Sequence, residues 1–289
     1  MTALRDLIEL TRLPAALTVP GDTLAGAAAA GSLPSWRAAP LAASSACLYW
    51  AGMALNDYAD RELDAQERPE RPIPSGRVSP STALRLAGGL TLAGLTLAAT
   101  AGPRPLAVAL PLAGAVWTYD LIAKPTVAGP LVMGTTRFLD VLMGGTANPR
   151  RALPAALALG VHTTAVTVLS RGEVHGTSTR TATATVATTG VVASAAAIQS
   201  LRDTSQPPAA RIAGAALAGT YASAVGQTQG DAVARPDPAT VRRATRRGIH
   251  GMVPLQASLI ARRGHLGIAA GLLALGPLLR AAAKVVSPT

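Results

Sequence analysis

The stretch Asn56-Asp57-Tyr58-Ala59-Asp60-Arg61-Glu62-Leu63-Asp64 directly follows an apolar run, residues 41–56, of about the length that crosses a bilayer. It opens an acidic segment, because six of the fifteen Asp and Glu residues of the chain lie between Asp57 and Glu70. Charge at the end of a buried apolar helix is costly, so carboxylates placed there usually bind a cation or take part in chemistry. The stretch therefore indicates a membrane helix with a polar site at its end.

The remainder of the chain is also too apolar for an ordinary soluble domain. Its 289 residues are 49% hydrophobic and 14% charged, with a mean hydropathy of +0.33. Apolar segments recur at 13–30, 41–56, 81–101, 105–119, 129–147, 153–169, 183–199, 207–225 and 249–283. Arg262 and Arg263 interrupt the last one, which could be one span plus an interfacial segment, or a hairpin. We predict an all-α, polytopic transmembrane bundle of nine, possibly ten, helices around a central cavity, forming one domain over residues 1–289.

Positive charge is distributed unevenly between the loops. With the N-terminus in the cytoplasm, fifteen Lys and Arg residues lie in or beside the loops on that side and six on the other. By the positive-inside rule, the acidic segment and an Arg-rich polar linker at 228–247 face the cytoplasm. The net charge of +11 then reflects topology and attraction to anionic membrane lipid. Aromatic residues make up only 3% of the chain, which argues against a nucleic-acid surface.

The acidic stretch has a helical spacing. If the helix continues past residue 56, then Asn56, Asp60 and Asp64 fall at i, i+4 and i+8 and share one face. Oxygen ligands without Cys or His suit Mg²⁺, which commonly binds through one or two carboxylates together with a substrate phosphate. The pattern favours a Mg²⁺ and diphosphate site. The alternative is a solvated loop in which the acids pair with Arg61, Arg68 and Arg71.

The same stretch, followed by Arg71-Pro72-Ile73-Pro74-Ser75-Gly76, resembles the first aspartate-rich motif of the UbiA superfamily of intramembrane prenyltransferases. Lys124, after Tyr119 at the end of the fourth span, is similar to the tyrosine and lysine pair of that family, with a spacing one residue longer. Arg12 lies where the family often has an arginine that faces the cavity.

The resemblance implies a membrane enzyme that uses Mg²⁺ to transfer a prenyl group from an isoprenyl diphosphate to an acceptor, which the sequence does not identify. Its catalytic residues would be Asp60, Asp64, Lys124 and Glu173. The implied metal ligands are Asn56, Asp60, Asp64 and Glu173. The implied substrate-binding residues are Arg12, Asn56, Arg61, Arg71, Lys124, Arg137, Arg171 and His175.

The loop after the sixth span departs from the family pattern. Ser170-Arg171-Gly172-Glu173-Val174-His175-Gly176 offers one carboxylate where the family usually carries a second set of aspartates. Glu173 could complete a second metal site with waters, with Arg171 and His175 beside it. This loop, together with residues 129–137, is similar to the UbiA-like subgroup encoded in bacterial ebo gene clusters, which implies a bacterial plasma membrane.

Charged and polar residues inside the spans are hypotheses for functional positions. The guanidinium of Arg137 is a candidate for binding phosphate oxygens in a planar fork, while Asp140 is expected to pair with Arg137 three residues away. Asp22 and His162 could serve the site or could form buried hydrogen bonds that only fix the packing.

Three functions compete. The first is a prenyltransferase whose active site opens to the cytoplasm. The second is a catalytically impaired homologue that binds or presents a lipid-linked compound to partner proteins, an alternative that the isolated Glu173 keeps open. A secondary transporter is disfavoured, because transporter sites lie near the bilayer midplane and the acids here cluster at one edge.

Overall fold

The computed structural model describes residues 4–12 and 19–275, and every regular element within these ranges is helical. The helices are α1 (Leu4–Thr11), α2 (Pro20–Ala30), α3 (Ala38–Ala59), α4 (Arg61–Glu67), α5 (Pro80–Ala101), α6 (Pro103–Thr118), the π-helical turn η2 (Tyr119–Ala123), α7 (Gly129–Gly144), α8 (Pro149–Ser170), α9 (Thr179–Arg202), α10 (Pro208–Ala234) and α11 (Pro238–Ala261). A short apolar helix, Leu266–Leu275, follows. The all-α prediction is confirmed.

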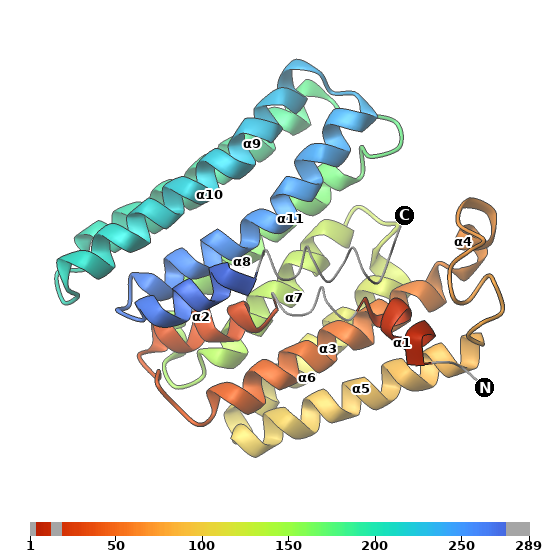
Figure 1. Ribbon diagram of the computed structural model, residues 1–289, viewed down its shortest axis with the longest axis horizontal. Helices are drawn as coiled ribbons and strands as arrows, with labels where there is room; N and C mark the ends of the chain where they lie inside the picture. The colour runs from red at the N-terminus through yellow and green to blue at the C-terminus, as the bar shows by residue number, and fades with distance from the viewer. Residues whose placement is uncertain (1–3, 13–18, 276–289) are drawn as a thin grey trace.

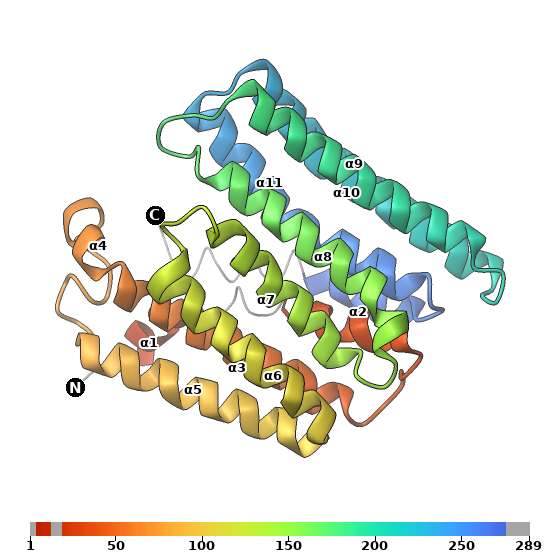
Figure 2. The ribbon, with the colours of Figure 1, turned by 180° about the vertical axis from the view of Figure 1, so that it is seen from behind.

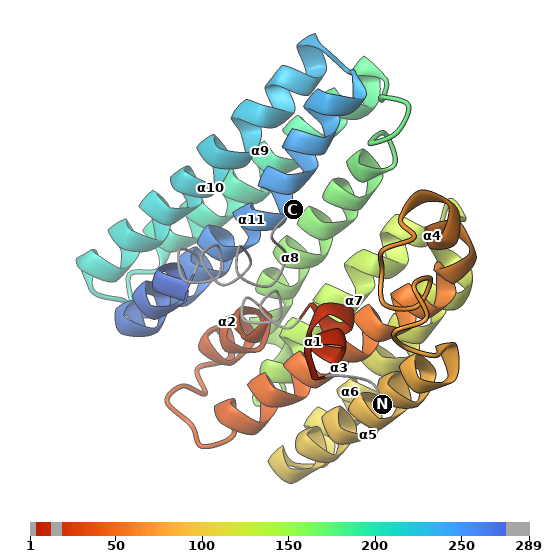
Figure 3. The same cartoon turned by 45° about the vertical axis from the view of Figure 1, so that its right-hand side comes forward.

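The helices form two halves that are joined through the middle of the bundle (Figure 1). One half holds α3, α5 and α6, and the other holds α9, α10 and α11 (Figure 2). Between them, α7 packs against α6, α2 and α8, and so links the two halves. The turned view in Figure 3 shows α4 beside the end of α3, at the end of the molecule where α11 begins.

The predicted spans correspond to helices, but their number and extents differ. In the described ranges, five helices are long and apolar enough to cross a membrane: α3, α5, α6 with η2, α8 and α9. The predicted number of nine or ten spans is therefore not confirmed, since five helices in the described ranges meet these criteria. The first predicted span falls partly on residues 13–18, which lie outside the described residues.

The prediction of a polar linker at 228–247 is wrong. The structure places these residues in the ends of α10 and α11, with a break only at residues 235–237. Asp237 ends the break because its Oδ1 accepts hydrogen bonds from the backbone N–H groups of Ala239 and Thr240, both at 3.0 Å. Pro238 follows at the first helical position, where its fixed φ favours a helix. Local capping therefore outweighs the polar composition.

The interruption predicted at Arg262 and Arg263 is present. Residues 262–264 form a turn, and Gly264 adopts a φ of +87°, a conformation that favours glycine. The helix Leu266–Leu275 then continues on the other side of the turn. The choice between a hairpin and an interfacial segment depends on residues beyond 275, which lie outside the described part of the chain.

Candidate active site at the end of α3

The backbone at the end of α3 preserves the spacing of the acidic stretch. Asp60 lies between α3 and α4, with φ −85° and ψ 1°, so the helix is interrupted there. Nevertheless, the N–H of Asp60 donates to the carbonyl of Asn56 at 2.9 Å, and the N–H of Asp64 donates to the carbonyl of Asp60 at 2.8 Å. The predicted four-residue register of Asn56, Asp60 and Asp64 is therefore kept across the break.

Three of the predicted cations converge on this stretch. Arg71 Nη1 lies 2.6 Å from Asp64 Oδ2 and 3.5 Å from Asp57 Oδ1. Arg12 Nη2 lies 3.2 Å from the same Asp57 oxygen, and Lys124 Nζ pairs with Asp60. Burial of Asp57 and Asp64 strengthens these ion pairs, because little water screens them. Arg12, Arg71 and Lys124 thus reach the acids from three separate parts of the chain.

Removing Arg71 should destabilise this end of the bundle. Arg71→Met leaves Asp64 buried without its cation, and breaking a buried ion pair in this way costs about 3 kcal/mol. We expect a lower free energy of unfolding and a lower melting temperature in detergent. Arg68→Met is the matched control, because Arg68 is exposed and its hydrogen bonds to Asp64 and Arg71 are made by its backbone, which the substitution keeps. Equal melting temperatures for the two variants would contradict the structural role of Arg71.

The π-helical turn η2 accounts for the long spacing between Tyr119 and Lys124. The N–H of Lys124 donates to the carbonyl of Tyr119 at 2.9 Å, an i to i+5 hydrogen bond that accommodates one extra residue. Lys124 therefore still points toward Asp60, in spite of the inserted residue. Such π turns are frequent at functional sites.

Asp120, on the same turn, is a site residue that the sequence analysis missed. It is 8% exposed, and its Oδ1 accepts a hydrogen bond from Asn56 Nδ2 at 3.1 Å. An acid directly after Tyr119, inside an apolar segment, was the available signal. Asn56 is thus oriented by a carboxylate from a different helix.

A cavity of about 350 Å³ extends from this cluster into the bundle. Arg12, Asn56, Tyr119 and Asp120 line it near the end of α3. Its walls come from α3, α6, α7, α8 and α11, and its apolar lining includes Val19, Leu48, Met53, Leu112, Val116, Met133, Val166, Ile249 and Met252. The cavity therefore combines a charged end with a largely apolar interior, in which Arg137, Asp140 and His162 are titratable lining residues.

Two further predicted arginines are engaged elsewhere. Arg61 donates to the carbonyl of Tyr58 at 2.9 Å, pairs with Glu62 at 3.1 Å and lies over the Tyr58 ring at 4.8 Å. Arg171 donates to the carbonyl of Thr126 and, at 3.4 Å, to that of Lys124. Arg171 therefore ties the end of α8 to the loop that carries Lys124.

Of the predicted site residues, Arg12, Asn56 and Arg137 line the cavity, whereas the following do not: Asp60, Arg61, Asp64, Arg71, Lys124, Arg171, Glu173 and His175. Glu173 is half-buried, and its carbonyl accepts a hydrogen bond from Arg242 Nη1 at 2.7 Å, while His175 is exposed. Within residues 4–12 and 19–275, no three or more His, Cys, Asp or Glu side chains are grouped to hold a metal ion. The oxygen donors Asn56, Asp60 and Asp64 still fit Mg²⁺ that arrives with a phosphate, because Mg²⁺ requires only one or two protein carboxylates.

The polar residues deeper in the bundle are paired differently from the prediction. Arg137 Nη1 lies 2.8 Å from Asp22 Oδ2, and Gln256 Nε2 donates to Asp22 Oδ1 at 2.6 Å. Asp140 accepts from Ser45 Oγ at 2.5 Å, so the predicted pair of Arg137 with Asp140 is wrong. Asp22 of α2 can form an ion pair with Arg137 of α7 because α2 packs directly on α7.

His162 has a partner at each ring nitrogen. Its Nε2 lies 3.0 Å from the carbonyl oxygen of Gly248, and its Nδ1 lies 2.8 Å from the hydroxyl of Tyr221. A buried imidazole with both nitrogens hydrogen-bonded connects α8, α10 and α11. These hydrogen bonds agree with the packing role of the two alternatives stated for His162, and His162 also lines the cavity.

These features define a polytopic helical membrane protein whose internal cavity ends in a cluster of paired acids and bases. The sequence model of the UbiA prenyltransferase family matches residues 18–234, and the chain belongs to this family. It is an integral membrane protein, as the family and its long apolar helices together indicate.

Known relatives match parts of the chain. It is 34% identical over 156 residues to the digeranylgeranylglyceryl phosphate synthase of Methanothrix thermoacetophila, covering 53% of this chain and 58% of the relative. The chain spans about half the length of the curated relatives it matches.

Solved structures share the fold over a greater length. A structure of digeranylgeranylglyceryl phosphate synthase superimposes with a TM-score of 0.70 and 16% identity, over 92% of this chain and 100% of the other. A UbiA homologue from Archaeoglobus fulgidus, bound to GPP and Mg²⁺, gives a TM-score of 0.61 and 12% identity, over 88% and 99%.

Proposed function

We propose that this protein transfers a prenyl group from an isoprenyl diphosphate to an acceptor within the membrane, with Mg²⁺ as cofactor. The observation that carries the proposal is the joining of a polar end, lined by Arg12, Asn56 and Asp120, to a largely apolar interior in one cavity. An allylic diphosphate has the same division, with an anionic head and an apolar tail. The GPP and Mg²⁺ bound by the homologue from Archaeoglobus fulgidus support this assignment.

The ion pairs and hydrogen bonds at the charged end support the following roles for its residues. Asp60 and Asp64, with Asn56, would hold Mg²⁺, which when bound neutralises the departing diphosphate. Lys124 pairs with Asp60 and is placed to stabilise the same negative charge. Asp120 fixes the Asn56 amide through a hydrogen bond. The apolar walls exclude water from a reactive allylic group.

The acceptor that we propose is a glyceryl phosphate lipid. The support is the name of the curated relatives, digeranylgeranylglyceryl phosphate synthase. These relatives are archaeal, so the assignment to the ebo-type subgroup and to a bacterial plasma membrane rests on the loop resemblance alone. The orientation of the acidic end toward the cytoplasm rests on the distribution of Lys and Arg.

The proposal predicts metal-dependent turnover. Purified protein in nanodiscs is incubated with geranyl, farnesyl or geranylgeranyl diphosphate, with a monoprenyl glyceryl phosphate and with either Mg²⁺ or EDTA. We expect release of diphosphate and a new prenyl ether in Mg²⁺, and a loss of both in EDTA, because the carboxylates cannot neutralise the leaving group. Product formation that is unchanged in EDTA would contradict the role of the metal.

A second candidate is a binding protein without turnover, and the position of Asp60, Asp64 and Glu173 outside the cavity lining favours it. The same incubation separates the two functions. Mg²⁺-dependent binding of the allylic diphosphate, without release of diphosphate under any acceptor, would identify a protein that binds or presents its lipid ligand.

A further inference from the structure

The charge at the α3 end of the cavity is nearly balanced. Four carboxylates, Asp57, Asp60, Asp64 and Asp120, gather there with three cations that pair with them: Arg12, Arg71 and Lys124. Such a wall has an excess of one negative charge when all groups are ionised. It suits a metal cation, but a phosphate group needs additional positive charge from another wall.

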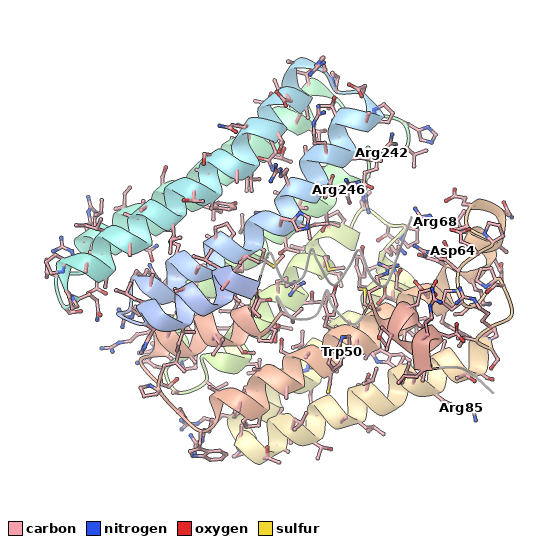
Figure 4. The ribbon with its side chains drawn as sticks, viewed as in Figure 1. Trp50, Asp64, Arg68, Arg85, Arg242 and Arg246 are labelled. Atoms are coloured by element: carbon pink, nitrogen blue, oxygen red, sulfur yellow. The ribbon has the colours of Figure 1, made fainter. Side chains whose placement is uncertain are left out.

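The first turns of α11 supply positive charge on the facing wall. Thr245 and Ile249 of α11 line the same cavity as Asn56 and Asp120. Arg242 and Arg246 are not among the residues that line the cavity, but they precede Ile249 by seven and three residues, and positions three, four or seven apart share one side of a helix. Figure 4 shows Arg242 and Arg246 on α11 at the end of the molecule where Asp64 and Arg68 are labelled on and beside α4.

Among the described residues, no acidic side chain forms an ion pair with either of these two arginines. Arg242 donates to a carbonyl, that of Glu173, at 2.7 Å. Arg246 is exposed, and among the described residues no acidic side chain pairs with it. Neither guanidinium group is therefore paired with a carboxylate among the described residues, and their planar donor arrays suit phosphate oxygens.

We propose that Arg242 and Arg246 bind a phosphate group of a substrate at the α11 wall, facing the metal-binding acids of α3 and α4. This inference rests on the proposed function. The phosphate belongs either to the diphosphate of the donor or to the headgroup of a phosphorylated acceptor. In both cases the arginines bind it directly, and the substrate lies between a metal wall and a guanidinium wall.

The same helix provides the control. Arg243 and Arg247 lie one residue further along, and so about 100° further around the helix, away from Ile249. The test compares Arg242→Gln/Arg246→Gln with Arg243→Gln/Arg247→Gln. Both double variants remove two positive charges from an exposed part of α11, so they change the net charge and the attraction to anionic lipid equally.

Binding is measured by calorimetry with two soluble probes, inorganic diphosphate with Mg²⁺ and glycerol phosphate. We expect Arg242→Gln/Arg246→Gln to lower the affinity for one probe by about tenfold or more. Arg243→Gln/Arg247→Gln should leave the affinity for both probes within about twofold of wild type. A loss for diphosphate identifies the donor as the source of the phosphate, and a loss for glycerol phosphate alone identifies the acceptor.

Two outcomes would overturn the inference. One is equal affinity of the two double variants for both probes. The other is an effect of Arg242→Gln/Arg246→Gln only on binding to vesicles of anionic phospholipid, which would mark an ordinary lipid contact. If wild type shows no turnover but Arg242→Gln/Arg246→Gln still loses affinity for diphosphate, the proposed function fails and the phosphate site stands.

Discussion

Asp60→Ala is expected to lower the rate of diphosphate release by on the order of 100-fold or more, because it removes a proposed ligand for the metal and the partner of Lys124. Asp60 lies in the break between α3 and α4. Its carboxylate pairs with Lys124, which directly follows the π-helical turn η2. The substitution therefore removes two interactions from the site at once, the proposed metal coordination and the ion pair with Lys124. Rates are measured with saturating allylic diphosphate and Mg²⁺.

Glu62→Ala is the matched control for this effect. Glu62 belongs to the same acidic stretch, but its side chain is 85% exposed and pairs only with Arg61 at the surface. We expect near wild-type turnover, because exposed ion pairs contribute little. The assignment of the site would be lost if Glu62→Ala impaired turnover as severely as Asp60→Ala, or if Asp60→Ala retained full activity in well-folded protein.

Gly144→Ala and Gly26→Ala are expected to have the largest effects on stability. A Cβ at Gly144 would lie 2.0 Å from the carbonyl oxygen of Thr23, and one at Gly26 would lie 1.9 Å from that of Val141. Both contacts are with backbone, which cannot move without separating α2 from α7. Overpacking costs about 1 to 3 kcal/mol where side chains can adjust, so we expect a loss at or above about 3 kcal/mol.

Gly88→Ala in α5 provides the comparison, since a Cβ there meets nothing within 4 Å. Alanine has the higher helix propensity, and this change should be neutral or stabilising by up to about 1 kcal/mol. Thermal unfolding in detergent, followed by helical circular dichroism, ranks the three variants. A melting temperature of Gly144→Ala equal to that of Gly88→Ala would show that α2 and α7 are not in backbone contact.

Periodicity and local motifs were sufficient to predict much of the molecule. The apolar segments correspond to helices from α3 to α10, because a chain in lipid must satisfy its backbone hydrogen bonds internally. The register of Asn56, Asp60 and Asp64 follows from the same local hydrogen bonding. The polar linker at 228–247 was predicted wrongly, because composition does not reveal a cap such as Asp237.

The partners of charged residues required the tertiary structure. Arg137 and Asp140 are neighbours on one helix, yet Arg137 binds Asp22 and Asp140 binds Ser45, each from a different helix. Asp120 and the role of Arg171 were similarly hidden, because their partners are 64 and 45 residues away in sequence. No spacing rule connects positions that far apart.

The sequence by itself determined the helical membrane fold, the register of the acidic stretch and the placement of that stretch at a helix end. These properties depend on hydrophobic length and on hydrogen bonds four residues apart, which are local. Only the tertiary structure decided which cation meets which acid, that a π turn brings Lys124 to Asp60, and that Thr245 and Ile249 of α11 line the same cavity as Asn56 and Asp120. Those relations depend on how helices pack against one another, and electrostatic pairing acts across space without regard to order along the chain.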